Sequence, residues 1–300
     1  MQKSDHLLFL ENIRKTYGKK VVLEDIDLAV SKGEFCTVVG PSGCGKSTLL
    51  RLIIGQESPA SGKIRMEGKA LSRPSPERGI VYQRYALFPH LRVVENIMIG
   101  KLLPLPFWKG FSAKKAAREE AMKYLEDINL SEHADKYPHQ LSGGMQQRVA
   151  IAQALITKPK ILLMDEPFGA LDPGTREAMQ VLILQLREAH NMTVFFVTHD
   201  LEEAVFLGSR LLVVSQYYSE EKEAGKSLGK GSRIVSDYPL NTASLKVKET
   251  AEFAQFIQQI RHEGFDSEHL QHVTQFNLDH PDSFQILTDN QTASLIQKVP

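Results

Sequence analysis

The chain contains 300 residues, with 36 lysine and arginine residues and 36 aspartate and glutamate residues, so its formal net charge is zero. This length suits one large α/β domain with an additional segment. A chain without net charge creates no global positive field, so we expect no nucleic-acid partner. The two cysteines, Cys36 and Cys44, are too few for a disulfide framework, which predicts a protein of a reducing compartment.

The hydropathy pattern predicts that the chain does not itself enter a membrane. Residues Met1 to His6 are polar and lack the apolar segment of a signal peptide. No apolar run approaches the roughly 18 residues that a membrane span needs. We therefore expect a soluble protein whose membrane role depends on a partner.

The stretch GPSGCGKST, from Gly40 to Thr48, carries the strongest signal in the chain. It follows an apolar run that predicts a buried strand, and it precedes a run that predicts an apolar helix face. Strand, glycine-rich turn and helix form the context of a phosphate-binding loop, in which backbone N–H groups and the helix dipole face a polyphosphate. An ordinary glycine turn before a helix is the alternative, but this setting favours nucleotide binding. The residues expected to contact nucleotide are Gly40, Pro41, Ser42, Gly43, Cys44, Gly45, Lys46, Ser47 and Thr48.

Two residues of this loop are expected to have particular roles. The Lys46 ammonium would reach the β- and γ-phosphates, and the Ser47 hydroxyl would bind Mg²⁺.

The residues before the loop predict an antiparallel hairpin, because apolar and polar residues alternate from Leu7 to Tyr17 and from Val21 to Val30. Tyr17 stands just before the turn at Gly18. Its ring could stack on a ligand or be an ordinary half-exposed strand tyrosine, and the pattern alone does not separate these two interpretations.

The residues after the loop predict further elements up to residue 130. They are a polar turn at Glu57–Gly62, strands at Lys63–Met66 and Gly79–Tyr82, a helix starting at Val93, and a helix over Ser112–Leu130. Gln83 lies at the end of the second of these strands.

The sequence LSGGMQQR, from Leu141 to Arg148, predicts a second helix start that can bind an anion. Ser142 is the expected N-cap, and Gly143 and Gly144 open the helix. One chain therefore contains two helix starts suited to phosphate.

Two carboxylates, Asp165 and Glu166, follow a short apolar strand at Ile161–Met164. Carboxylates in such a place need a cation or a proton, so Asp165 suits the Mg²⁺ shell and Glu166 suits a general base for water. A helix-capping acidic pair is the weaker alternative, because Pro167 and Phe168 continue as a loop. Asp172 before Pro173 is a standard helix start.

A further buried strand, Thr193–Val197, leads to His199. The carboxyl end of a parallel strand is where α/β sites form, although a structural histidine is an equally good interpretation of this residue alone. Strands are also predicted at Leu211–Ser215 and Arg233–Ser236, with a surface loop between them. Beyond Leu240 the pattern changes, and one helical face must bury against something: Phe253, Phe256, Ile257 and Ile260.

Together these motifs resemble the ATP-binding subunit of an ABC transporter over about Leu7 to Leu240. The stretch from Gly40 to Thr48 is similar to the Walker A loop, ILLMDEP (Ile161 to Pro167) to the Walker B strand, and LSGGMQQR to the family's signature. Four shorter motifs also match: Tyr17 as the A-loop aromatic, Gln83 as the Q-loop, Ala170, Leu171 and Asp172 as the D-loop, and His199 as the H-loop.

The resemblance implies an α/β fold with a P-loop NTPase core of the ABC ATPase type. This core would carry an antiparallel β subdomain and a helical subdomain at about residues 92–157. The cassette would occupy residues 1–240, followed by a small C-terminal extension, residues 241–300, whose role the sequence does not indicate.

The resemblance also implies an ATPase that uses ATP and Mg²⁺ in a head-to-tail dimer, formed by two copies or by two paired cassettes. Each nucleotide would lie between one protomer's Walker A loop and the other protomer's signature, with Ser142, Gly143, Gly144 and Asp172 contributing. Implied catalytic residues are Glu166, His199, Gln83 and Lys46, and implied metal-shell residues are Ser47, Gln83 and Asp165. Implied partners are integral membrane permease subunits and a solute-binding protein, at the cytoplasmic face of the plasma membrane.

Within the family, the chain resembles bacterial importer subunits, nearest the nitrate, sulfonate and taurine group, because of the run GSRIVSDYPL. YALFPHLRVVENI is closer to polyamine and sulfate importers, but their long regulatory β-barrel is not evident after Leu240. The alternative function is a non-transport ABC ATPase in DNA repair or on ribosomes, which the modest insertion and single cassette disfavour. A P-loop kinase or GTPase is disfavoured by the signature and by the lack of an NKxD motif.

Overall fold

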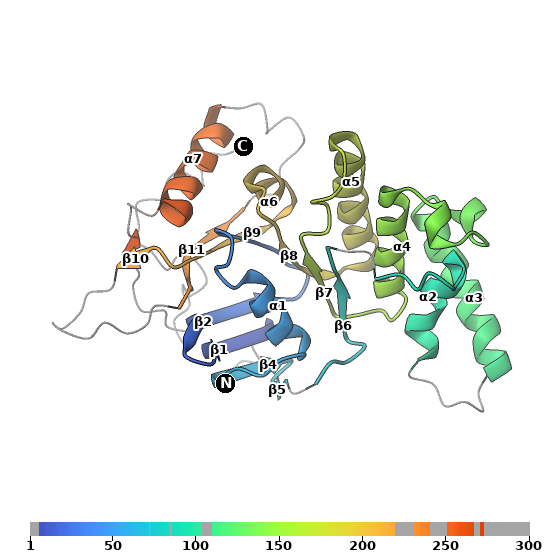
Figure 1. The fold of residues 1–300 in the computed structure, drawn as a ribbon, viewed down its shortest axis with the longest axis horizontal. Helices are drawn as coiled ribbons and strands as arrows, with labels where there is room; N and C mark the ends of the chain where they lie inside the picture. The colour runs from blue at the N-terminus through green and yellow to red at the C-terminus, as the bar shows by residue number, and fades with distance from the viewer. Residues whose placement is uncertain are drawn as a thin grey trace. The chain divides into compact units, whose positions relative to one another are not determined.

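The computed structural model describes residues 6–71, 73–83, 86–103, 110–219, 231–240, 251–266 and 271–272 (Figure 1). The chain forms two compact units. The first comprises Met1–Pro74 and Phe195–Pro300, and the second comprises Ser75–Val194. In the described residues of both units, no helix is long and apolar enough to cross a bilayer.

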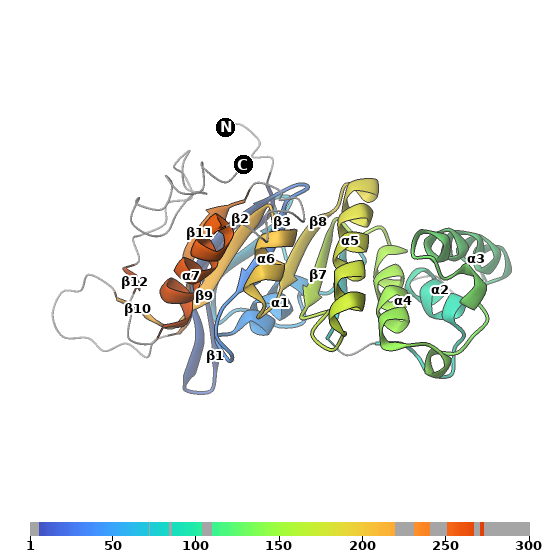
Figure 2. The same cartoon turned by 90° about the horizontal axis from the view of Figure 1, so that it is seen from above.

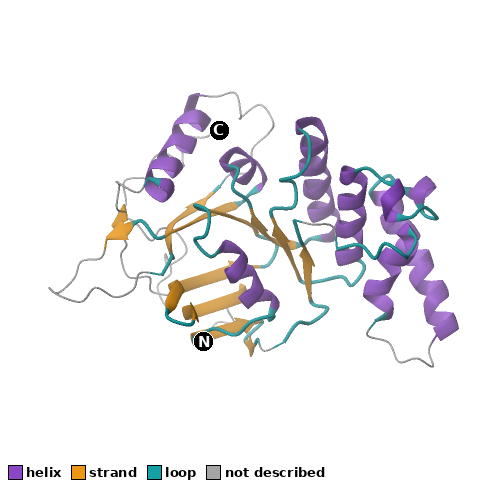
Figure 3. Ribbon diagram, in the orientation of Figure 1, coloured by secondary structure: helices purple, strands orange, loops and turns teal. Residues whose placement is uncertain are grey.

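The first unit contains a four-stranded antiparallel sheet in the order β2-β1-β4-β5 (Figure 1), and Figure 3 shows its strands in orange. Its strands are β1 (His6–Tyr17), β2 (Lys20–Ser31), β4 (Ser61–Met66) and β5 (Lys69–Ala70). The predicted hairpin is confirmed: Tyr17 pairs with Lys20 across a turn in which Gly18 has a φ of 58°. The predicted strand at Lys63 begins two residues earlier, at Ser61.

The first unit also contains parallel strands that carry the phosphate-binding loop. All five residues of β3 (Phe35–Val39) are buried, as the apolar run predicts, and β3 runs parallel to β9 (Arg210–Ser215). Strand β9 pairs antiparallel with β11 (Arg233–Pro239), while β10 (Tyr218–Ser219) and β12 (Gln271–His272) form a short parallel pair. Two helices complete this region: α1 (Lys46–Ile54) and α6 (Leu201–Leu207). In the predicted loop between β9 and β11, residues 220–230 lie outside the described residues.

The apolar face predicted beyond Leu240 is confirmed as helix α7 (Ala251–Phe265), which packs beside β9 and β11 (Figures 1 and 2). Phe253, Ile257 and Ile260 join one buried cluster with side chains of β3, α6, β9 and β11. A polar contact adds to this packing, because the buried Glu263 carboxylate accepts hydrogen bonds from Ser236 Oγ (2.9 Å) and from the Tyr238 hydroxyl. The helix thus shares the hydrophobic core of the first unit. A domain boundary at Leu240 stays a prediction.

The second unit combines a parallel strand pair with helices (Figure 1). Strand β6 (Arg78–Val81) pairs with β7 (Ile161–Asp165), and β8 (Thr193–Val197) leads the chain into the first unit. The helices are α2 (Val93–Leu102), α3 (Gly110–Asp127), α4 (Gly143–Leu155) and α5 (Pro173–His190), with short 3₁₀ turns at Ser131–His133 and Pro138–Gln140.

Two predicted boundaries in this unit were wrong by a few residues. The strand predicted at Gly79–Tyr82 begins and ends one residue earlier. The helix predicted to continue to Leu130 ends at Asp127, because Asn129 adopts a left-handed conformation with a φ of 56° and the chain turns there.

Candidate nucleotide-binding site

The glycine-rich loop connects β3 to α1 through backbone conformations that only glycine tolerates easily. A Cβ at Gly40 would lie 2.0 Å from the Val214 carbonyl oxygen, so β9 approaches the start of the loop too closely for any side chain. Gly45, the N-cap of α1, has a φ of 95°, and no side chain caps the helix there. The N-cap of α1 therefore offers no side chain to the first turn of the helix. A helix start of this kind suits an anion.

Lys46 places its charge inside this loop. The residue is only 7% exposed, and its ammonium donates hydrogen bonds to the carbonyl oxygens of Gly40 (2.7 Å) and Pro41 (3.0 Å). Nearby, burial raises the pKa of the Cys44 thiol, which therefore stays neutral at physiological pH. The loop thus holds one buried cation beside the N-terminus of α1.

His199 lies at the same edge of the first unit as the loop. The Thr198 amide donates to the Val38 carbonyl oxygen (3.1 Å), two residues before Gly40, so the chain leaves the strand end beside the loop. The Thr198 hydroxyl donates to Glu203 (2.6 Å), and this bond holds the turn that carries the exposed His199.

A hollow of about 360 Å³ adjoins this histidine, and the sequence did not predict that α7 would line it. One wall comes from the start of α6 and the other from α7; the lining residues are His199, Asp200, Leu201, Glu202, Ile257, Arg261 and Phe265. No spacing rule connects α7 to the histidine, since about 60 residues separate them in the sequence.

In the second unit, strand register brings Gln83 to Glu166. Val81 pairs with Met164 in the parallel ladder of β6 and β7, so residues two positions further along both strands emerge side by side. The Gln83 amide nitrogen lies 3.5 Å from a Glu166 carboxylate oxygen. Glu166 also has a φ of 45°, a strained conformation for a residue other than glycine, and such strain concentrates at functional sites. The two residues were predicted separately, and the structure places them together.

The two other predicted helix starts also lie together in the second unit. The predicted N-caps are confirmed: the Ser142 hydroxyl accepts from the Met145 amide (3.4 Å), and the Asp172 carboxylate accepts from the Thr175 amide (3.0 Å). A Cβ at Gly144 would lie 2.4 Å from Thr175 Cγ2, so the starts of α4 and α5 are in contact. The backbone-to-side-chain bond lowers the pKa of Asp172, which keeps this carboxylate ionised.

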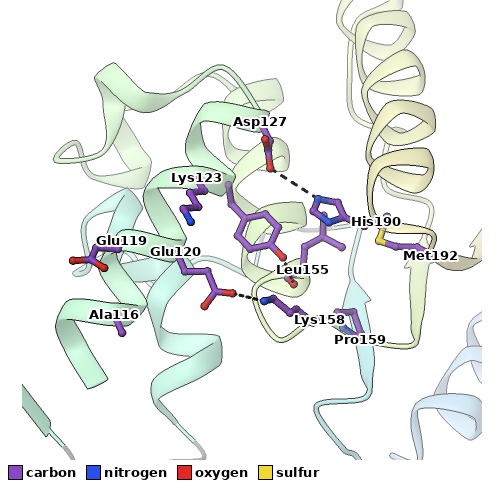
Figure 4. Close-up of a pocket in the computed structure, with 11 residues that line it drawn as sticks. Ala116, Glu119, Glu120, Lys123, Asp127, Leu155, Lys158, Pro159, His190 and Met192 are labelled. Carbon is purple, nitrogen blue, oxygen red and sulfur yellow. Dashed lines mark hydrogen bonds and ion pairs between the residues drawn. The ribbon is translucent and has the colours of Figure 1, made fainter. Parts of the chain in front are cut away.

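A larger hollow, of about 650 Å³, lies elsewhere in the second unit between α3 and the ends of α4 and α5 (Figure 4). Tyr124 donates to the Leu155 carbonyl oxygen (3.0 Å) and stacks on His190, while Glu120 pairs with Lys158 (3.0 Å). None of the residues predicted to bind nucleotide or metal lines this hollow.

The predicted metal-shell residues have donors that suit Mg²⁺. Ser47, Gln83 and Asp165 offer a hydroxyl, an amide carbonyl and a carboxylate, all of them oxygen ligands of the kind this ion prefers. Few protein ligands are needed when substrate phosphates complete the shell. Ser47 belongs to the first unit, whereas Gln83 and Asp165 belong to the second.

A glycine-rich loop with a buried lysine, placed between a buried strand and a helix, defines a P-loop nucleotide-binding protein. The ABC transporter family model matches residues 23–169, which include the loop, the signature and both carboxylates. The chain belongs to the ABC transporter ATP-binding family, and its enzyme class is that of the ABC ATPases.

Relatives from bacteria carry import and transport names. The chain is 43% identical over 218 residues to the bicarbonate transport ATP-binding protein CmpD of Synechocystis sp., covering 71% of this chain and 76% of that protein. It is 42% identical over 237 residues to the spermidine/putrescine import ATP-binding protein PotA of Chromobacterium violaceum, covering 77% of this chain. This second match spans 64% of the length of PotA.

Solved cassettes share the fold. One is the dimeric ATP-binding cassette MJ0796 in a post-hydrolysis state with ADP and Pi, with a TM-score of 0.60 and 34% identity over 69% of this chain and 93% of that chain. Another is CbiO1 of Clostridium perfringens, part of the ABC transporter complex CbiONQ, with a TM-score of 0.63 and 27% identity over 70% of this chain and 85% of that chain.

Proposed function

We propose that this chain binds and hydrolyses ATP in a head-to-tail dimer and so energises import of a small solute through a separate membrane permease. The observation that carries this proposal is the pair formed by Gln83 and the strained Glu166 at the end of β7. A carboxylate directly after a buried strand, with an amide beside it, suits activation of a water molecule.

The phosphates are bound by the first unit. The uncapped start of α1 and the Lys46 ammonium hold the β- and γ-phosphates, and Tyr17 stacks on the adenine. His199 contacts the γ-phosphate from the neighbouring strand end. Ser47, Gln83 and Asp165 would hold a Mg²⁺ ion, which would supply charge neutralisation for the phosphates.

The second unit provides the base and the contact to the partner. Glu166 accepts the proton of the attacking water, and Gln83 orients that water. Ser142, Gly143 and Gly144 of one protomer, with Asp172 beside them, face the nucleotide held by the other protomer. Closure of the dimer around two nucleotides and its reopening after hydrolysis would drive the permease between its two access states.

Glu166→Gln in the full chain tests the base role. The amide keeps the size of the side chain but accepts no proton, so ATP turnover should fall at least ~100-fold while ATP binding persists. The dimer should then accumulate with ATP and Mg²⁺ on size-exclusion chromatography. Glu177→Gln, the same change at an exposed position of α5, is the matched control and should leave turnover unchanged. Wild-type turnover in Glu166→Gln would remove Glu166 from this role.

The proposed solute is a small anion or organic solute such as nitrate, sulfonate or taurine. The run GSRIV at Gly231–Val235 and the bicarbonate transport relatives favour an anion. Relatives of similar identity are named for a polyamine and for Fe(3+), so cassette similarity alone does not discriminate solutes. The subunit would lie at the cytoplasmic face of the plasma membrane, held there by its permease, with a solute-binding protein delivering the solute.

ATPase stimulation in the complex with permease and solute-binding protein tests the solute. Nitrate or taurine should stimulate turnover and spermidine should not. Stimulation by spermidine alone would contradict the anion assignment. A complete lack of a permease partner would instead favour a non-transport ATPase, which the import names of the relatives argue against.

A further inference from the structure

A compact group of charged side chains surrounds Tyr17, and no motif accounts for it. The Tyr17 hydroxyl donates to a Glu57 carboxylate oxygen (2.5 Å). The Lys15 ammonium pairs with the same oxygen (2.8 Å) and donates to the Ser58 carbonyl oxygen (2.9 Å). Arg51 adds a longer ion pair to the other carboxylate oxygen (3.6 Å). Glu57 therefore receives three partners from two different elements.

The backbone around Glu57 is held on both sides. Helix α1 ends at Ile54 with Gly55 as its C-cap, and the Glu57 amide donates to the Arg51 carbonyl oxygen (3.2 Å). Three residues later, the Ala60 amide donates to the Arg14 carbonyl oxygen of β1 (2.7 Å). This turn thus connects the helix that begins at the phosphate-binding loop with the strand that ends at Tyr17.

The charge state and the burial of the group make it more than an ordinary surface ion pair. Such pairs usually contribute little, because both long side chains must be ordered in water. Here the side chains of Lys15 and Glu57 are only 13% and 23% exposed. Hydrogen bonds from Lys15 and Tyr17 lower the pKa of Glu57, so the acceptor stays ionised and the tyrosine bond is charge-assisted.

The Tyr17 ring has two faces in different surroundings. Lys15 and Tyr17 lie two residues apart on β1, and both side chains reach the same Glu57 carboxylate oxygen. The Lys15 ammonium stands over the ring, 5.0 Å from its centroid, in cation–π geometry. Tyr17 is nevertheless 44% exposed. One face is therefore occupied by a cation, and a planar ligand must use the other.

We propose that Glu57 and Lys15 are positioning residues for Tyr17, which fix its ring so that the face opposite Lys15 is presented to the adenine base. This inference rests on the proposed role of Tyr17 in ATP binding and adds two residues outside the family motifs. It explains why an exposed aromatic side chain at a hairpin end holds one orientation before any base arrives. Preorganisation of this kind raises affinity because less side-chain freedom is lost on binding.

The test compares ADP with inorganic tripolyphosphate, which has phosphates but no base, by calorimetric titration of the full chain. Tyr17→Ala should weaken ADP binding about tenfold and leave tripolyphosphate binding unchanged. Glu57→Leu and Tyr17→Phe should each weaken ADP binding about threefold, and the double variant should be no weaker than either single variant. Glu57→Gln, which keeps an acceptor for the hydroxyl, should restore most of the ADP affinity. Glu11→Leu breaks an exposed ion pair with Arg65 on the same sheet and is the matched control.

The outcomes separate this inference from the proposed function. If Tyr17→Ala weakens ADP binding and neither Glu57→Leu nor Tyr17→Phe does, the positioning role is wrong and base stacking stands. Equal losses for ADP and tripolyphosphate in Glu57→Leu would show a general structural role and overturn the inference. An unchanged ADP affinity in Tyr17→Ala would remove Tyr17 from base binding altogether.

Discussion

Helix α1 of the first unit differs from helices α4 and α5 of the second unit in how the N–H groups of the first turn are satisfied. Helix α1 of the first unit begins after Gly45, in a left-handed conformation and without a side-chain cap. Helices α4 and α5 of the second unit begin after Ser142 and Asp172, both in extended conformations and both accepting a hydrogen bond from their own first turn. All three starts were predicted from sequence as sites for phosphate or as standard caps.

This difference indicates two ways to stabilise the positive end of a helix dipole: by a bound ligand or by a capping side chain. At α1 the backbone itself is the proposed binding surface, so its shape must be held by close packing, as between Gly40 and Val214. At α4 and α5 a side chain accepts a hydrogen bond from an N–H group of the first turn. This cap stabilises the helix without a ligand. The cap bond of Ser142 is long, at 3.4 Å, so little stability would be lost if its hydroxyl turned toward a phosphate as proposed.

The largest effect is expected from adding one methyl group to the loop that leads into α1 and, for comparison, to the first turn of α5. In Gly40→Ala the new Cβ would meet the Val214 carbonyl oxygen, so the first unit should lose about 3 kcal/mol of stability or fail to fold. Gly174→Ala, in the first turn of α5, would meet only Asp172 Oδ1 at 3.7 Å and should be neutral or stabilising by up to ~1 kcal/mol. Thermal unfolding measures both, and similar stabilities would show that the loop before α1 and the first turn of α5 tolerate a side chain equally.

A second pair of variants separates the role of Lys46, the buried cation, from the role of Ser142, the exposed N-cap. Lys46→Ala should weaken ATP binding to the monomer roughly 100-fold, because losing charge-assisted hydrogen bonds to the phosphates costs about 3 kcal/mol. Ser142→Arg should leave monomer binding near normal, since Ser142 is exposed, and should eliminate hydrolysis by blocking the partner's γ-phosphate. If Ser142→Arg weakened monomer binding as much as Lys46→Ala does, the proposed head-to-tail arrangement would be wrong.

The smallest effect concerns pH, because one cap titrates and the other does not. The pKa of Asp172 lies below its ordinary value, so the stabilisation by this carboxylate is complete above about pH 4 and is lost as pH falls through the folded-state pKa. Urea unfolding between about pH 6 and pH 3 should therefore depend less on pH in Asp172→Asn than in the wild type. Ser142→Ala should keep the wild-type pH dependence, and a change there would mean that another group titrates.

Local sequence determined much of the fold and of the candidate site. Glycine spacing, apolar runs and cap residues depend on neighbours in the chain, so the loop at Gly40, the caps at Ser142 and Asp172 and the hairpin at Gly18 were predicted correctly. Boundaries were less certain, because a single left-handed residue such as Asn129 ends a helix whose pattern would allow it to continue. The roles assigned to Tyr17 and to the other site residues stay predictions.

Only the tertiary structure decided which of these local features meet. Gln83 and Glu166 come together because β6 and β7 pair in one register, and a shift of one strand by one residue would turn one of these side chains to the opposite face from the other. The apolar face of α7 was evident from sequence, but its place against β9 and β11 depends on contacts with segments that are distant in the chain. Glu57 reaches Tyr17 across 40 residues for the same reason: contacts between distant segments depend on backbone paths that no local pattern records.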